Sequence, residues 1–174
     1  MNDFLKGLCS GCAKLLKLIL VSFVLLGCQS VEVGTTGRTV PQNKWILLSE
    51  AGNQSGKWQT QDLILEYEYD RDHTHLYITG VIHFVTPIRN QWGLVEYFHL
   101  DLIPVDAQGA VLEMIPLTTT GEVNLLTDGP VDFTKTLTLP GNTAAMAFSY
   151  TGKGSGGGSY CDGGYGDFWE YPYY

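Results

Sequence analysis

Hydrophobic and polar residues alternate along two neighbouring segments in the first half of the chain. In residues 63–69 the odd positions are apolar, while Glu66 and Glu68 occupy even positions. In residues 76–84 four apolar residues share one face: Leu76, Ile78, Ile82 and Phe84. A period of two is typical of a half-buried strand, and the polar residues 70–75 indicate a hairpin turn. The pattern therefore predicts two paired antiparallel strands.

Further segments rich in β-forming residues follow, separated by turn sequences. Strands are expected at residues 93–104, 111–117, 131–139 and 144–150. The turns are Asp-Ala-Gln-Gly at 106–109, Asp-Gly-Pro at 128–130 and Pro-Gly-Asn at 140–142. After residue 28 no window has a helix-period apolar stripe of a dozen residues. This spacing predicts an all-β fold, an antiparallel two-sheet sandwich of about seven strands.

Two parts of the expected sandwich resemble the small immunoglobulin-like or fibronectin-like domains of bacterial lipoproteins. Residues 98–117 contain the Asp-Ala-Gln-Gly turn, and Ala147-Phe148-Ser149-Tyr150 form a later aromatic strand. The resemblance implies an immunoglobulin or fibronectin-like arrangement of strands. It is general, so it brings no catalytic residues with it.

The first residues of the chain have the three parts of a secretory signal. Lys6, Lys14 and Lys17 supply positive charge, residues 18–26 are apolar, and Gly27 is the small residue at a cleavage position. A membrane-spanning helix needs about 20 apolar residues. The apolar segment is much shorter than this, so an uncleaved membrane helix is the weaker alternative.

The sequence Leu25-Leu26-Gly27-Cys28 resembles the lipobox of bacterial lipoproteins, although Leu26 stands where a small or β-branched residue is more usual. The resemblance implies cleavage between Gly27 and Cys28, a diacylglycerol on the Cys28 thiol and acylation of the new amino group. Gln29 follows, where many lipoproteins of the inner membrane have aspartate. The resemblance thus implies an envelope protein in the outer membrane, facing the periplasm.

The net charge of the chain limits the classes of partner that it can bind. The chain has a formal net charge of −8, from ten lysines and arginines and eighteen acidic residues. Cleavage at residue 27 would remove three of the basic residues and Asp3, which leaves a net charge of −10 on the mature chain. Nucleic acids and anionic lipid headgroups attract basic surfaces. We therefore expect no nucleic-acid partner, and we expect the lipid on Cys28 to hold the protein at the membrane.

The chain divides into four expected parts. Residues 1–27 are the signal peptide, 28–43 a polar and glycine-bearing tether, 44–151 the β-sandwich domain, and 152–174 a glycine-rich linker with an aromatic tail. Cys9 and Cys12 lie in the signal, so their Cys-x-x-Cys spacing carries no function in the mature protein. Cys161 is then left without an internal partner. It is either an unpaired thiol in the tail or a partner in an intermolecular disulfide.

Seven of the last fifteen residues are aromatic. Tyrosine and tryptophan are frequent anchors of protein interfaces because their rings pack while a polar atom stays solvated. The expected partner-binding residues are Tyr165, Phe168, Trp169, Tyr171, Tyr173 and Tyr174. Two alternatives stay open: residues 168–174 fold back onto the sandwich as an edge strand or surface cover, or the tail is disordered.

Candidate chemistry elsewhere is weak. His73 and His75 with Asp70 and Asp72 could bind a transition metal, but these are also ordinary hairpin residues, so no metal site is assigned. Glu66 and Glu68 could form a hydrolytic pair, yet alternating glutamates on a solvated face are commoner.

No catalytic residue and no cofactor is predicted, since the chain has none of the motifs of a nucleophile elbow, a zinc protease or a phosphate loop. We expect an accessory lipoprotein that binds an envelope protein through sheet edges or the tail. A small-ligand or carbohydrate-binding protein that stacks sugars on Trp45, Trp58, Trp92 or Trp169 is the alternative, and a hydrolase is a weaker one.

Overall fold

The computed structural model describes residues 37–49, 52–156 and 164–174. All the described residues belong to one compact unit, Thr35–Tyr174. The predicted cleavage at Gly27, the lipidation of Cys28 and the thiol of Cys161 lie outside the described residues. In the described part of the chain, no helix has the length and apolar character needed to cross a membrane.

The first sheet has four antiparallel strands in the order β2-β3-β4-β8. They are β2 (Gln54–Gln59), β3 (Leu63–Asp72), β4 (His75–Phe84) and β8 (Val131–Thr138). The predicted hairpin is confirmed, but its turn is tighter than residues 70–75, because Asp72 still pairs with His75. His73 makes the tight turn possible by adopting a positive φ of 51°.

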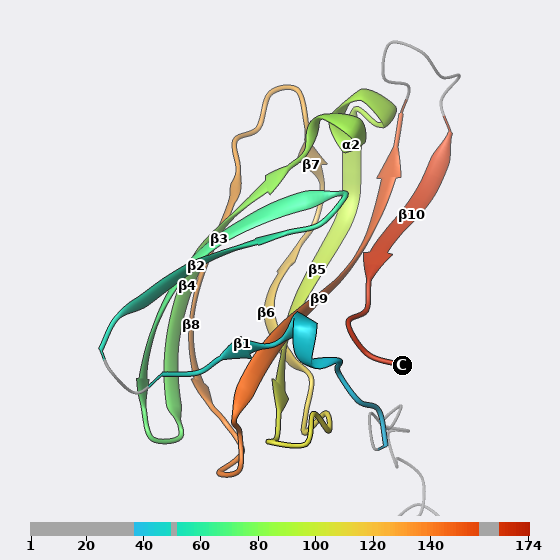
Figure 1. The fold of residues 1–174 in the computed structure, drawn as a ribbon. Coiled ribbons are helices and arrows are strands. Elements are labelled where there is room, and N and C mark those ends of the chain that lie inside the picture. Colours follow the sequence, from blue (N-terminus) through green and yellow to red (C-terminus); the bar gives the residue numbers. More distant parts are fainter. Residues whose placement is uncertain (1–36, 50–51, 157–163) are drawn as a thin grey trace, which may run out of the picture. The chain divides into compact units, whose positions relative to one another are not determined.

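The second sheet is built on the long central pair β5 (Leu94–Val105) and β9 (Ala145–Ser155). Two strands pair with different segments of the outer edge of β9: β1 (Ile46–Leu47) and β10 (Tyr165–Glu170). Two strands likewise share the outer edge of β5: β6 (Ile115–Thr120) and β7 (Val123–Asn124). The helix α2 (Thr86–Gln91) joins β4 to β5, and a 3-10 turn, η1 (Gln42–Lys44), precedes β1 (Figure 1).

The strands form an all-β sandwich, as predicted. If β3, β4, β5, β6, β8, β9 and β10 are read as A, B, C, C′, E, F and G, the two sheets are A-B-E and C′-C-F-G. This is the strand order of immunoglobulin-like sandwiches. The strand β2 extends the first sheet beyond this pattern. The strand expected at residues 111–117 begins later, at Ile115, because Val111 forms an isolated bridge to Val105 near the turn.

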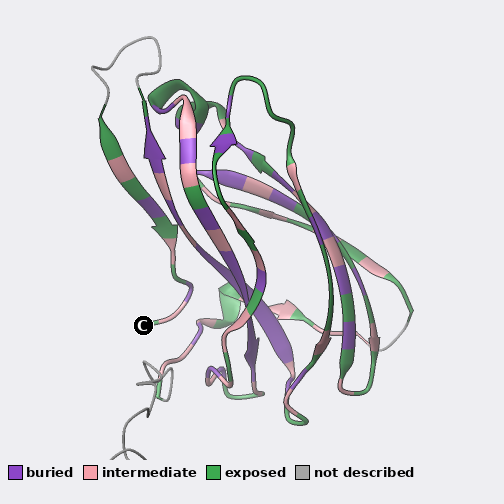
Figure 2. Cartoon of the chain, turned by 180° about the vertical axis from the view of Figure 1, so that it is seen from behind, coloured by how far each residue is buried: buried purple, intermediate pink, exposed green. Residues whose placement is uncertain are grey.

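A single apolar layer holds the two sheets together. It contains Leu63 and Leu65 from β3, Phe148 and Tyr150 from β9, and further residues of both sheets. In β3 the burial alternates as the sequence pattern predicts, and Glu66 and Glu68 are exposed. Figure 2 shows buried and exposed residues interleaved along the strands. The period of two is thus the signature of one buried and one solvated face.

The outer face of the second sheet is also covered at one end, which shifts one expected boundary. Val40 is buried there in a small cluster with residues of β5 and β9, and Trp45 and Tyr173 pack against it. Trp45 Nε1 donates a 2.7 Å hydrogen bond to the carbonyl oxygen of Val40. Residues 38–43, assigned from the sequence to the tether, therefore include part of the folded domain.

The other corrected boundary is at the carboxyl end. Residues 152–155, assigned from the sequence to a glycine-rich linker, are the last residues of β9. Tyr165–Glu170 return antiparallel to them as β10, with Phe168 opposite Gly152. The alternative in which the tail folds back as an edge strand is therefore the observed one, although the strand spans Tyr165–Glu170 and not residues 168–174. The linker expectation fails because glycines leave the space that aromatic rings then fill.

Candidate functional site

The strand β10 is fixed on its inner side by aromatic rings that lie over glycines. Phe168 is only 5% exposed and occupies the space that a Cβ atom at Gly152 would need. Trp92 lies in the same way against Gly154 and Gly166. The rings of Trp92 and Phe168 stack with centroids 5.5 Å apart and planes 29° apart. A tail rich in aromatics and glycines is thus held firmly to the sheet.

The outer side of the same strand carries exposed aromatic residues. We define the aromatic face as Tyr97, Tyr165, Trp169 and Tyr171, whose exposed fractions are 43%, 72%, 56% and 46%. Trp169 lies opposite Thr151, and Thr151 lies opposite His99 of β5. Tyr97 and Asp167 both lie opposite Lys153. Because directly opposed residues share a face, Trp169 and Tyr97 belong to one surface, two strand spacings across and two residues along, or roughly 12 Å apart.

Lys153 lies at the centre of this surface. Its Nζ atom is 3.0 Å from Oε2 of Glu96 and 4.7 Å from the centroid of the Tyr165 ring. The hydrogen bond with Glu96 raises the pKa of Lys153, and the same bond lowers the pKa of Glu96. A bulge at residues 95–97 in the pairing of β5 with β9 brings Glu96 beside the lysine. The ammonium group thus holds one ring of the aromatic face in place.

A row of polar side chains continues the surface toward β6. His99 Nε2 is 2.8 Å from Oδ1 of Asp101, and its Nδ1 is 2.6 Å from Oγ1 of Thr119. Burial raises the pKa of Asp101, and the neighbouring imidazole acts in the opposite direction. In catalytic triads the carboxylate contacts Nδ1 and the hydroxyl contacts Nε2, the reverse of this arrangement. Because the two contacts are reversed, we assign no reaction to this group.

A cavity of about 400 Å³, which we call the edge cavity, lies beside β10. Its walls come from the β2–β3 turn, from α2 and the residue after it, and from β10: Gln61, Asp62, Ile88, Gln91, Trp92, Gly166, Asp167, Phe168 and Trp169. Asp62 is buried, and its Oδ2 accepts a 2.6 Å hydrogen bond from the hydroxyl of Tyr150. Burial raises the pKa of Tyr150, so this hydroxyl keeps its proton.

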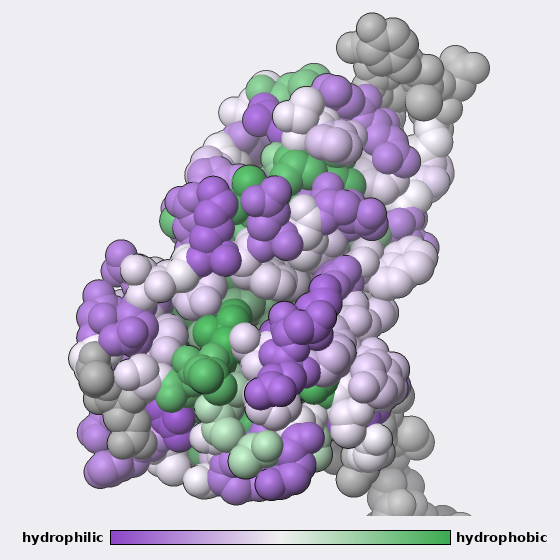
Figure 3. Space-filling view, viewed as in Figure 1, coloured by the Kyte–Doolittle hydropathy of each residue, from purple (hydrophilic) through white to green (hydrophobic). Residues whose placement is uncertain are grey.

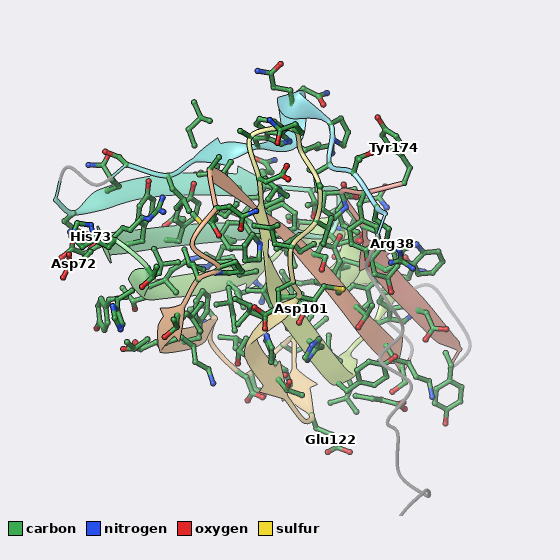
Figure 4. All side chains as sticks on the ribbon, turned by 90° about the horizontal axis from the view of Figure 1, so that it is seen from below. Arg38, Asp72, His73, Asp101, Glu122 and Tyr174 are labelled. Atoms are coloured by element: carbon green, nitrogen blue, oxygen red, sulfur yellow. The ribbon has the colours of Figure 1, made fainter. Side chains whose placement is uncertain are left out.

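The last residues of the chain pack on the outer face of the second sheet, near Val40. Tyr173 donates a hydrogen bond to Sδ of Met114 at 3.7 Å, and the Arg38 guanidinium lies 4.7 Å from its ring centroid. Thr39 and Tyr174 exchange two backbone hydrogen bonds. Figure 4 shows Arg38 and Tyr174 on one side of the domain and Asp72 and His73 at its other end. The two chain termini of the described domain are therefore tied together.

The aromatic residues predicted from the sequence have different positions in the structure. Tyr165, Trp169, Tyr171 and Tyr174 are exposed. Phe168 is a core residue, and Tyr173 packs against the small cluster around Val40. In Figure 3 the surface over β10 is pale, because tyrosine, tryptophan and glycine have intermediate hydropathy.

Sequence reasoning did not assign Tyr97, Lys153 or Asp62 to this region. The alternation in residues 93–104 could have placed Tyr97 on the exposed face with His99. The pairing of β5, β9 and β10, which brings Lys153 beside Tyr97, has no local sequence signal.

The other candidate groups lie elsewhere. His73 is 3.9 Å from Asp72, but among the described residues no group of three histidine, cysteine or acidic side chains is placed to hold a metal ion. Glu66 and Glu68 line a shallow hollow of about 550 Å³ on the first sheet, where Lys57 forms a 3.3 Å ion pair with Glu66. Two of the three charged side chains that line the hollow are therefore already paired with each other.

Comparisons with protein-family models, with curated proteins and with solved structures find no match to this chain.

Proposed function

We propose that the protein is a lipid-anchored lipoprotein of the bacterial envelope that binds another envelope protein through the aromatic face and the adjoining edge of β10. The lipobox at residues 25–28 supports the anchor and the export. The resemblance at Gln29 favours the outer membrane, with the domain in the periplasm. The acidic net charge, −8 for the whole chain and −10 after the proposed cleavage, supports a protein partner over nucleic acid or a bare lipid surface.

The gathering of exposed rings on one sheet is the observation that carries this proposal. Contiguous exposed aromatic surface on a folded domain is typical of an interaction site. The inner side of β10 is packed, so the backbone that carries the outer rings is already fixed. Binding a partner then costs little backbone conformational entropy. Among the described strands only β9 pairs with β10, so the other edge of β10 adds backbone groups that can pair with a strand of a partner.

Carbohydrate binding receives less support from the tryptophans that could stack on sugars. Trp58 packs against Phe148 and Tyr150, and Trp92 packs against Phe168. Trp45 belongs to the small cluster around Val40. In the described part of the chain, Trp169 is therefore the tryptophan whose ring is largely exposed. One platform is a weaker basis for this function than a broad aromatic face.

The test is chemical crosslinking in native membranes followed by recovery of the lipoprotein. A chain ending at Thr151 would not isolate the tail, because it would also remove Phe168 from the core. A double variant, Tyr165→Ser with Trp169→Ser, changes only exposed side chains and should leave the fold intact. We expect it to recover at least tenfold less of a discrete partner than the unmodified protein.

The matched control is Tyr77→Ser, which removes an exposed tyrosine from β4 in the other sheet. Its recovery of the partner should equal that of the unmodified protein. Equal recovery by the double variant would overturn the proposed interface.

A further inference from the structure

The edge cavity borders the one side of β10 that has no strand beside it in the described part of the chain. Residues 166–169 are consecutive, and all four line the cavity. Side chains of a strand alternate between faces. A cavity that touches four successive residues must therefore lie along the strand's edge, where backbone groups are unpaired. An extended segment that pairs with β10 would pass over the mouth of this cavity.

Asp62 supplies an unpaired acceptor inside the cavity. The residue is 7% exposed, and one carboxylate oxygen, Oδ2, is taken by Tyr150. No hydrogen bond from the described residues reaches the other oxygen, Oδ1. Ser149 Oγ is the fully buried side-chain oxygen without a partner in the same residues, so Oδ1 of Asp62 retains access to space. The space that Asp62 lines is the edge cavity.

The walls of the cavity combine acidic and amide side chains with apolar ones. Both ionisable lining residues, Asp62 and Asp167, are acids, and Gln61 and Gln91 add amide oxygens. Rings of Trp92 and Phe168 and the side chain of Ile88 supply the apolar part. A cationic head on an aliphatic stem complements both parts, because the stem packs on apolar surface while the head finds oxygen acceptors.

We propose that the edge cavity receives a lysine side chain from an extended segment of the partner protein, and that this segment pairs with the free edge of β10. The inference rests on the proposed function and names the chemistry of its partner. Lysine fits better than arginine, because Asp62 offers one free oxygen and cannot form a two-pronged pair with a guanidinium group. A buried carboxylate with a free oxygen gains its missing partner in the complex.

Zero-length coupling with a carbodiimide in native membranes tests this contact. The reagent joins a carboxyl group to an amine in direct contact, so tandem mass spectrometry should find an amide bond between Asp62 and a lysine of the partner. The lysine should lie in a segment predicted to be extended. If the partner is still crosslinked through the aromatic face but Asp62 is joined to no lysine, the cavity proposal is wrong and the proposed function stands. Loss of both would overturn both.

Two variants separate the contact from a folding defect. Asp62→Asn keeps an acceptor for Tyr150 but removes the charge, and we expect at least a fivefold fall in partner recovery. Gln61→Lys changes an exposed residue and places an ammonium group of the chain itself at the cavity, which should block the partner's lysine to a similar extent. Asp132→Asn, on the exposed side of β8, is the control and should have no effect. Unchanged recovery with Gln61→Lys, or recovery that free sugars but not lysine peptides compete away, would overturn the proposal.

Discussion

Asp62 illustrates how one residue serves both the fold and the proposed site. Its backbone carbonyl accepts a hydrogen bond from the amide of Val85, and its amide donates to the Thr60 hydroxyl. Its side chain accepts from Tyr150 on the opposite sheet. The carboxylate is thus held in position by both layers of the sandwich, at the wall of the edge cavity.

The hydroxyl of Tyr150 is expected to contribute measurably to stability. Tyr150→Phe would leave Oδ2 of Asp62 buried without its donor, at a cost of about 1–3 kcal/mol in the free energy of unfolding. Urea denaturation measures this cost. Tyr77→Phe is the control, since Tyr77 is exposed, and should change stability by less than about 0.5 kcal/mol. An equal effect of the two substitutions would show that the Tyr150–Asp62 bond is unimportant.

At the scale of elements, β10 depends on the glycines of β9. Gly152 and Gly154 leave the inner face of β9 open, and Phe168 and Trp92 fill that space. An ion pair of 3.1 Å between Lys44 and Glu170 adds a surface contact at the end of the strand. The ring contacts bury far more apolar area than the exposed ion pair, so they dominate the stability of this edge.

Gly154→Ala tests the glycine requirement. The added methyl group would overlap the Trp92 ring, so the ring or β10 must move, and we expect a loss of about 1–3 kcal/mol in the free energy of unfolding. Gly141→Ala, in a turn with open space around the position, should cost less than about 0.5 kcal/mol. Chemical denaturation of the two variants compares them directly. A neutral Gly154→Ala would mean that β10 is not anchored by this contact.

The elements that sequence reasoning predicts are those with a local signal. Alternation in residues 63–84 predicts β3 and β4, and turn sequences separate β5, β6, β8 and β9. The strand β10 has no such signal, because its glycine-rich sequence is typical of a flexible tail. It becomes a strand through a contact distant in sequence, the pairing of Phe168 with Gly152. The short helix α2 is too short to show a helical period.

The candidate site was predictable only in part. The abundance of tyrosine and tryptophan near the carboxyl end indicates contact residues, and four of the six predicted side chains are exposed. The edge cavity forms where Asp62 and Gln91 lie close to β10. In the sequence these two residues are separated from β10 by more than half the length of the domain. Such a tertiary contact is determined by the order of strands in the sheets, and the spacing of motifs in the sequence does not predict it.

At the scale of the whole molecule, the proposed anchor accounts for how an acidic domain stays at an anionic membrane. The negative charge opposes adsorption to the headgroups, whereas covalent acyl chains contribute about 0.8 kcal/mol for each buried methylene. With this anchor the domain would remain near its proposed membrane partner at a high effective concentration. A modest affinity of the aromatic face would suffice for a stable complex.

Replacement of the proposed lipid site gives a direct prediction. Cys28→Ala should abolish palmitate labelling and move the protein from the detergent phase to the aqueous phase. Cys161→Ala is the matched control and should retain both properties. Continued labelling of Cys28→Ala would contradict the lipoprotein assignment.

The measurement that tests the central claim most directly is site-specific photocrosslinking in living cells. A photoreactive phenylalanine analogue would replace Trp169 on the aromatic face or, in a parallel strain, Tyr77 on the other sheet. Our account predicts a discrete adduct with one envelope protein from position 169 and none from position 77. Adducts of equal yield from both positions, or none from position 169 while the protein is folded and membrane-bound, would contradict it.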